Sequence, residues 1–247
     1  DIKTLEGIEA IRLRPGMYVG SVGPAGVRHI TLEIISNAVD EFRLGHGNQI
    51  DIIIDKDIIT VRDYGQGFIP NSYREDGKTI LEAAFSVLNT SGKYREDGTY
   101  EGTSLGSFGI GSKITTFLSH WLRVVTIRDK KMESINFKEG VFDQRVTGVE
   151  NAEPTGTIVE WEPSEEFFTH PEVEVAKVKS LFETIVCLCP GLTINLDDNS
   201  GYAITVSGSI LFTLPVVTDL TILHKIFVQL YMPTVYSLKK VQHTQTL

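Results

Sequence analysis

The sequence predicts an α+β fold: a two-layer sandwich whose mixed, mostly antiparallel sheet carries helices on one face. Two observations lead to this fold class. Short β-branched runs, several of them joined by polar turns, predict strands that pair through hairpins. Longer segments with apolar residues at a period of 3.6 are interleaved with them and predict helices that cover the sheet. With 247 residues and 41% hydrophobic side chains, the chain can bury the core that such a sandwich needs.

The first elements are helical. Residues 5–11 predict a short helix, which the following Pro15-Gly16 stops. Residues 17–19 are expected to form a short strand. Residues 27–44 predict a long helix, because apolar side chains recur at helical spacing and Gly45 follows the last of them.

A hairpin and a long connection come next. The β-branched runs 50–55 and 58–63 are separated by two polar residues, which is a hairpin signal. Residues 79–88 predict a helix. Residues 89–112 are rich in Gly and Ser and poor in apolar side chains, and a connection of that length is usually functional or disordered.

The second half of the chain predicts most of the antiparallel sheet. A helix resumes at 114–118, another covers 173–188, and one more is expected at 220–231. Strands are expected at 122–128, 133–137, 142–146, 157–161, 192–196 and 202–206. We expect residues 1–214 to form one domain and residues 215–247 to form a tail with a short helix.

Composition narrows the functional classes. A net charge of −9 does not predispose the chain to bind nucleic acid through its own surface. Its two cysteines, Cys187 and Cys189, form neither a disulfide framework nor a metal cluster, which indicates a reducing, cytoplasmic location. No segment has the apolar length of a membrane span, and no signal peptide opens the chain.

Three polar side chains line one side of the helix at 27–44. Glu33, Asn37 and Glu41 are four residues apart, beside the apolar stripe. Such a set suits a metal ion and a water beside a phosphate: Glu33 as general base and Asn37 as a Mg²⁺ ligand through its amide oxygen. The same spacing is also typical of an ordinary amphipathic surface helix, so the assignment depends on the motifs that follow.

Asp63 ends a predicted strand and precedes Gly65 and Gly67. The glycines let a flat ligand approach the backbone, and the carboxylate can accept a hydrogen bond from the exocyclic amine of adenine. A simple Asp-Gly turn between strands explains this motif equally well when it is taken alone.

The Gly-rich segment 102–111 leads into a predicted helix. Backbone N–H groups at a helix N-terminus favour anions, and glycines let several of them converge on phosphate oxygens. The segment is not a Walker motif, since no Gly-Lys-Ser/Thr ends it. Lys93 adds a positive charge that could approach a terminal phosphate. The alternative is a flexible surface loop with a solvated lysine.

The order of these three motifs resembles that of the Bergerat-type ATPases. Within this group, residues 14–20 read Arg-Pro-Gly-Met-Tyr-Val-Gly and closely resemble a signature near the start of the DNA gyrase B and topoisomerase IV ParE subunits. The resemblance extends from Leu5 to about Leu196. It implies a Bergerat-type sandwich that binds ATP with Mg²⁺ and hydrolyses it.

The resemblance assigns roles residue by residue. Glu33 matches the catalytic base and Asn37 the magnesium ligand. Asp63 matches the residue that reads adenine, with Thr157 supporting it through a water. Arg128 matches an arginine at the mouth of the pocket, where aminocoumarin-type inhibitors also reach. The complete set of implied ATP-binding residues is Asn37, Glu41, Asp63, Gly65, Gly67, Ile69, Lys93, Gly106, Gly109, Gly111, Arg128 and Thr157.

The chain also departs from the family pattern. Gln66 stands where the family usually has an arginine, so Glu41 is expected to lack its usual partner. Phe68-Ile69-Pro70 carries one residue more than the usual Gly-Ile-Pro. The family's N-terminal arm and the transducer lysine have no match in this sequence. The chain alone is therefore expected to be a monomer with slow hydrolysis.

In the intact enzyme of this family, the subunit forms a homodimer that acts with a gyrase A or ParC-type DNA-cleaving subunit on DNA. ATP binding closes a gate for strand passage. Two other functions remain open from the residues: a nucleotide-binding switch with little hydrolysis, and a phosphotransferase similar to the histidine kinases. A scaffold with a degenerate pocket is disfavoured by the retention of Glu33, Asn37 and Asp63.

Overall fold

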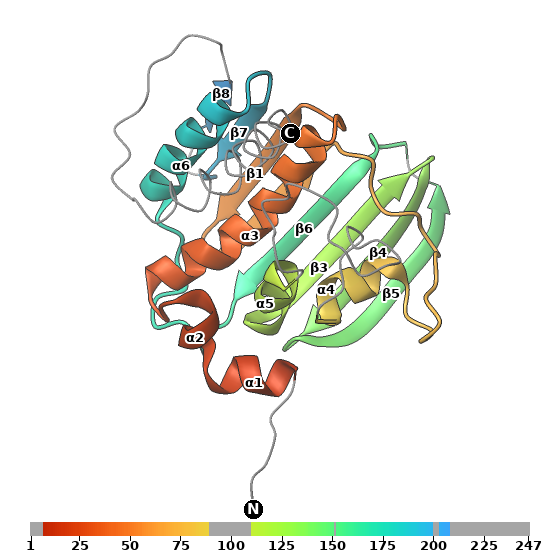
Figure 1. Cartoon of the computed structure of the whole chain (residues 1–247), viewed down its shortest axis with the longest axis horizontal. Coiled ribbons are helices and arrows are strands. Elements are labelled where there is room, and N and C mark those ends of the chain that lie inside the picture. Colours follow the sequence, from red (N-terminus) through yellow and green to blue (C-terminus); the bar gives the residue numbers. More distant parts are fainter. Residues whose placement is uncertain (1–6, 89–109, 151, 200–202, 208–247) are drawn as a thin grey trace, which may run out of the picture.

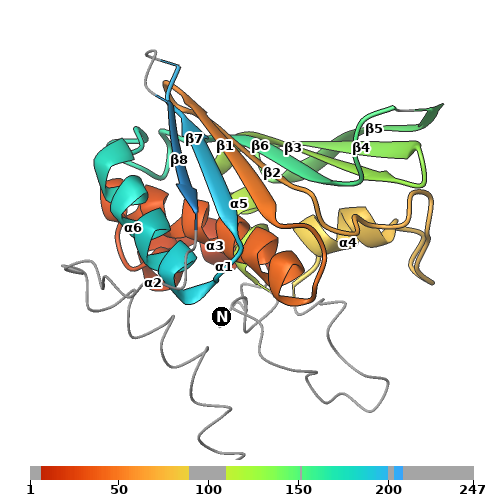
Figure 2. The same cartoon turned by 90° about the horizontal axis from the view of Figure 1, so that it is seen from above.

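The structure is a computed structural model that describes residues 7–88, 110–150, 152–199 and 203–207. These residues form one eight-stranded sheet with its helices on a single face, as the two perpendicular views in Figures 1 and 2 show. The predicted α+β sandwich is therefore confirmed. The boundary expected at residue 214 and the helix expected at 220–231 lie outside the described residues.

The sheet is mixed and mostly antiparallel. Its strand order is β5-β4-β3-β6-β2-β1-β7-β8, and the pair β1–β7 is parallel while all other neighbours are antiparallel. The strands are β1 (Gln49–Asp55), β2 (Ile58–Asp63), β3 (Ser119–Arg128), β4 (Lys131–Lys138), β5 (Val141–Glu150), β6 (Gly156–Pro163), β7 (Thr193–Asp197) and β8 (Ala203–Ser207).

The helices of the described residues form the second layer. They are α1 (Ile8–Leu13), α2 (Pro15–Val19), α3 (Pro24–Arg43), α4 (Ile80–Ser86), α5 (Gly111–Phe117) and α6 (Val175–Leu188). None of them combines the length and the apolar character that crossing a membrane requires. Thr79 caps α4, since its side chain accepts a hydrogen bond from the backbone N–H of Glu82.

Several bounds differ from the sequence prediction: α1 ends at Leu13 instead of residue 11, α3 begins at Pro24 instead of residue 27, and β3 and β5 are longer than expected. The other differences concern α2 and α5. Residues 17–19 were expected to form a strand, but they belong to α2. Pro15 occupies the first turn of this helix, where its missing N–H costs nothing, and Gly20 ends it in the left-handed conformation at φ +74°. Helix α5 begins at Gly111, three residues before the predicted start.

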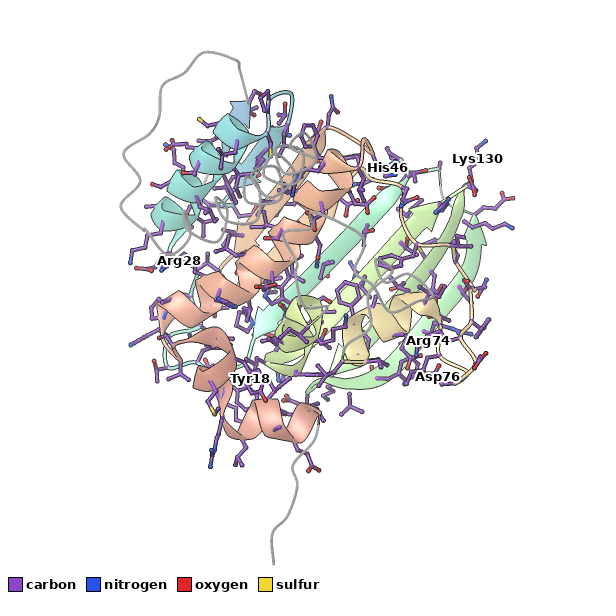
Figure 3. All side chains as sticks on the ribbon, viewed as in Figure 1. Tyr18, Arg28, His46, Arg74, Asp76 and Lys130 are labelled. Atoms are coloured by element: carbon purple, nitrogen blue, oxygen red, sulfur yellow. The ribbon has the colours of Figure 1, made fainter. Side chains whose placement is uncertain are left out.

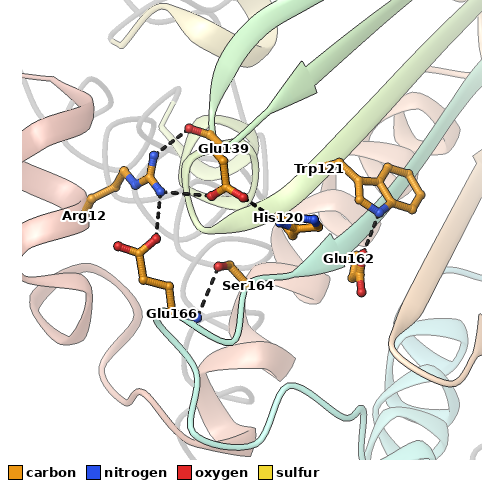
Figure 4. A network of polar contacts seen from close by, with 7 residues as sticks. All are labelled: Arg12, His120, Trp121, Glu139, Glu162, Ser164 and Glu166. Atoms are coloured by element: carbon orange, nitrogen blue, oxygen red, sulfur yellow. Dashed lines mark hydrogen bonds and ion pairs between the residues drawn. The ribbon is translucent and has the colours of Figure 1, made fainter.

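Arg12 fastens α1 to the far end of the sheet. Its guanidinium donates to the backbone oxygen of Glu139 at 2.6 Å and to the Glu139 carboxylate at 3.1 Å (Figure 4). It also donates to Glu166 Oε2 at 3.0 Å and lies 4.9 Å from the centre of the Phe167 ring. The signature segment that begins at Arg14 is thereby docked against the β4–β5 turn and the segment after β6.

The helix-facing side of the sheet holds the core. On β3, Leu122 lies opposite Phe137 of β4 and Trp161 of β6, and all three are buried. Further along the same face the side chains become polar. This row consists of Asp63, Thr157, Thr126 and Glu133, which β2, β6, β3 and β4 contribute in turn and which are all buried. Buried polar groups are costly unless they are bonded, so this end of the core is the first place to look for a site.

Candidate nucleotide site

Asp63 is the centre of the polar end of the core. Its side chain is 9% exposed, and its Oδ1 accepts hydrogen bonds from the backbone N–H of Gly65 at 2.9 Å and of Thr157 at 3.1 Å. Burial raises the pKa of Asp63 to about 7, and the nearby Glu41 acts in the same direction. The two backbone bonds lower the pKa but do not outweigh burial. Asp63 is thus a fixed acceptor whose charge is sensitive to pH near neutrality.

The glycines around Asp63 are required by the chain's own packing. A Cβ at Gly65 would lie 2.6 Å from Glu41 Oε2, and one at Gly67 would lie 2.8 Å from the backbone oxygen of Ile127. A Cβ at Gly156 would overlap the backbone oxygen of Asp63. We predicted that Gly65 and Gly67 let a ligand approach the backbone. The structure shows that both glycines are already needed for close packing against other parts of the chain, Gly65 against Glu41 and Gly67 against Ile127.

Glu41 has a partner that the sequence did not reveal. Its Oε2 accepts a hydrogen bond from the backbone N–H of Gln66 at 3.1 Å. Gln66 itself is exposed, so the backbone at this position replaces the arginine side chain that the family resemblance led us to expect. The contact ties the C-terminal end of α3 to the turn that follows Asp63.

Glu33 lies against the beginning of α5. A Cβ at Gly111, the first residue of that helix, would overlap Glu33 Oε2. His29 approaches the other carboxylate oxygen, with Nε2 3.5 Å from Oε1. Asn37, one turn further along α3, is exposed. The Glu33 carboxylate therefore stands beside Gly111, where the Gly-rich segment ends.

Arg128 and Phe68 shape the segment after Asp63. Arg128 Nη1 donates to the backbone oxygen of Gly67 at 3.2 Å. The resemblance assigned Ile69 to the pocket, but Ile69 is 58% exposed, whereas Phe68 is partly buried and packs against the core. The inserted residue thus shifts the apolar side chain by one position, and Phe68 is the better candidate for the pocket wall.

Three predicted site residues, Lys93, Gly106 and Gly109, lie outside the described residues. Of the glycines assigned to the lid, the structure describes Gly111. Lys113 was not among the predicted site residues. It is 3% exposed at the third position of α5, and burial lowers its pKa to about 8. Only its position just after the Gly-rich segment could have singled it out.

Comparison with known proteins identifies relatives of this chain. No protein-family model matches it. It is 38% identical over 199 residues to the DNA topoisomerase 4 B subunit of Mycoplasma capricolum subsp. capricolum, a match that covers 80% of this chain and 30% of that protein. It is 34% identical over 198 residues to the DNA gyrase B subunit of Thermotoga maritima, with 80% and 31% covered.

A third relative agrees with these two. The DNA topoisomerase 4 B subunit of Streptococcus pneumoniae serotype 4 is 35% identical over 201 residues, which are 80% of this chain and 31% of that protein. The chain thus spans about three tenths of the length of the relatives it matches. The matched four fifths of this chain are therefore homologous to a segment of the gyrase B and topoisomerase IV B subunits.

Proposed function

We propose that this chain is an ATP-binding and ATP-hydrolysing domain of a type II topoisomerase B-type subunit. The observation that carries the proposal is Asp63, a buried acceptor that two backbone N–H groups hold in place at the end of β2. The exocyclic amine of adenine can donate to such an acceptor, whereas the corresponding carbonyl of guanine cannot. Gly65 and Thr157 bond Asp63 through their backbone, Gly67 and Phe68 follow in the same turn, and these four residues would form the adenine end of the pocket.

Hydrolysis is assigned to Glu33. A carboxylate within reach of a water can take its proton as the water attacks the terminal phosphorus. Glu33 lies against the N-terminus of α5, where the Gly-rich segment ends, so it stands on the side of the site where phosphates would bind. Lys93 and the backbone around Gly106, Gly109 and Gly111 would cradle these phosphates.

The donor set on α3 fits Mg²⁺. Asn37 would hold the ion through its amide oxygen, a hard ligand beside the Glu33 carboxylate. Among the described residues, no three His, Cys, Asp or Glu side chains gather as a metal cluster, so phosphate oxygens and water would complete the coordination. When bound, the ion would neutralise charge on the phosphates.

Two alternative functions would use the same pocket. A nucleotide-binding switch with little hydrolysis needs Asp63 but not Glu33 as a base. A histidine-kinase-like phosphotransferase is not favoured, because the relatives are topoisomerase B subunits. As part of such a subunit, the domain would work in a homodimer with a gyrase A or ParC-type subunit and DNA in the cytoplasm. Arg128, at the mouth of the pocket, is where aminocoumarin-type inhibitors would be expected to bind.

Phosphate release measured for the parent chain and Glu33→Gln tests the catalytic proposal. The substitution keeps the size of the side chain and removes the base, so turnover should fall by about 10²–10⁴-fold. ATP binding, measured by calorimetry on the same samples, should change little. Equal turnover in both proteins would place the base elsewhere. Binding without turnover in the parent chain would favour the switch.

A further inference from the structure

The segment that follows the Asp63 turn is fastened to three strands by buried and half-buried side chains. Residues 64–79 connect β2 to α4 and pass beside the β5 edge of the sheet, where Figure 3 labels Arg74 and Asp76. Near Asp63 the segment is held by Arg128, which donates to the Gly67 backbone oxygen, and by the Tyr64 hydroxyl, which donates to Asp51 of β1. From Phe68 onward, further contacts come from a set of side chains on the helix-facing side of the sheet, which we call the loop seat. The loop seat consists of Thr126 of β3, Glu133 of β4, and Arg145 and Thr147 of β5.

Two members of the loop seat, Thr126 and Arg145, hold the loop on either side of Asn71. Thr126 Oγ1 accepts from the backbone N–H of Phe68 at 2.7 Å and donates to the backbone oxygen of the same residue at 3.2 Å. Arg145 donates to the Tyr73 hydroxyl at 2.7 Å, with its guanidinium 5.2 Å from the ring centre. The loop is therefore held at its beginning and at its end.

Asn71, between these points, is held from two sides. Its backbone N–H donates to Glu133 Oε2 at 2.8 Å, and its side-chain oxygen accepts from Thr147 Oγ1 at 2.7 Å. Asn71 has a φ of +58°, in the left-handed region that asparagine adopts more readily than most non-glycine residues. Glu133 and Thr147 hold it in that conformation through one backbone bond and one side-chain bond.

Burying Glu133 at this position costs free energy. It is 0% exposed, and its Oε1 is buried without a hydrogen-bond partner among the described residues. A buried carboxylate with a single donor costs free energy that an apolar residue at the same place in the strand would not. Since its opposite neighbours on the helix-facing side are Thr126 and Thr147, strand pairing alone does not call for a charge. The bond to Asn71 is the contact that explains it.

We propose that Glu133 is a positioning residue for the nucleotide pocket. By fixing Asn71, it holds the stretch from Gly65 to Phe68 between two anchors, Asp63 at one end and the loop seat at the other. This stretch forms the wall beside the adenine-reading carboxylate, so nucleotide affinity depends on Glu133 although Glu133 does not touch the nucleotide. The inference rests on the proposed function for its effect on ATP, but not for its effect on the loop.

The test compares Glu133→Ala and Glu133→Gln in the full chain. Alanine removes the acceptor for Asn71, so hydrogen exchange of residues 65–73 should rise and ATP affinity should fall by about tenfold, the loss expected for one hydrogen bond. Glutamine keeps an acceptor oxygen and should restore both measurements to within about twofold of the parent. Glu162→Gln is the matched control: Glu162 binds the Trp121 indole on the opposite face of the sheet and should leave the loop unchanged.

The two measurements separate the two proposals. If the parent chain does not bind ATP, the proposed function fails, and exchange in residues 65–73 without nucleotide still tests the loop seat. Unchanged exchange and affinity in Glu133→Ala would overturn the inference. So would a rise in exchange spread evenly over the whole sheet. If Glu133→Ala does not fold, Thr147→Val removes the second contact to Asn71 and should give the same local rise in exchange; its absence would also overturn the inference.

Discussion

At the scale of single residues, the proposed chemistry depends on a buried carboxylate, Asp63. The roles proposed for Asp63 and Glu33 follow from the sequence because their spacing to glycines and to Asn37 is visible along the chain. The partial burial of Phe68, next to the exposed Ile69, could not be predicted, because it depends on how the turn after Asp63 packs against the core. Glu133 could not either, since its meaning depends on the register of β3, β4 and β5 and on a loop that is distant from it in sequence.

The raised pKa of Asp63 predicts a pH dependence of stability. The folded chain binds this proton more tightly than the unfolded chain, because the pKa is raised from 3.8 to about 7. The contribution of Asp63 to the free energy of unfolding is therefore largest below about pH 4. It is lost progressively as the pH rises to about 7 and changes no further above that. Asp63→Asn has no titrating group at this position, so it removes this contribution to the change of the free energy of unfolding with pH.

Urea unfolding of the parent and Asp63→Asn at a series of pH values between about 4 and about 8 measures the effect. The difference between the two free energies of unfolding should change over this range in favour of the variant as the pH rises. A difference that is constant with pH would show that Asp63 is already ionised in the folded chain at low pH.

At the scale of elements, turn-forming residues decide between helix and strand where the spacing of apolar residues does not. Residues 17–19 have β-branched and aromatic character, yet the proline before them and the glycine after them make them a helix. The strands β1, β2, β4 and β7 were predicted well because buried side chains alternate along them, and α3 because its buried side chains recur at helical spacing. The close approach of β2 and β6 at Gly156 was not predicted, because it depends on two segments that are far apart in sequence.

Gly156→Ala tests this approach against a control glycine, Gly148, on the edge strand β5 of the same sheet. Both Gly156 and Gly148 have positive φ, at +150° and +79°, but a Cβ at Gly156 overlaps the Asp63 backbone while nothing lies within 4 Å of one at Gly148. Gly148→Ala should lower the free energy of unfolding only by the backbone strain, about 1–3 kcal/mol. Gly156→Ala should lower the free energy of unfolding by more than this and should also weaken ATP binding. Equal losses in thermal unfolding would mean that β2 and β6 are less close than the structure places them.

At the scale of the whole molecule, the sheet carries a row of four buried polar side chains, Asp63, Thr157, Thr126 and Glu133, across four neighbouring strands. The helices lie on one face of the sheet (Figure 2). Asp63, Thr126 and Glu133 face the same side in the strand register, and Glu33 comes from helix α3. The fold class could be predicted from the sequence because hairpins and amphipathic helices alternate along it. The arrangement of the polar end could not, because strands from four parts of the chain meet there.

The most direct test of the adenine site is a calorimetric titration of the parent chain and Asp63→Asn with ATP and with GTP, in the presence of Mg²⁺. We expect the parent to bind ATP and to bind GTP at least about tenfold more weakly. Asp63→Asn should lose about 1.5–3 kcal/mol of ATP affinity, the range for a hydrogen bond to a charged group. Equal affinities for ATP and GTP, or ATP binding that Asp63→Asn leaves unchanged, would contradict the central claim that Asp63 reads adenine.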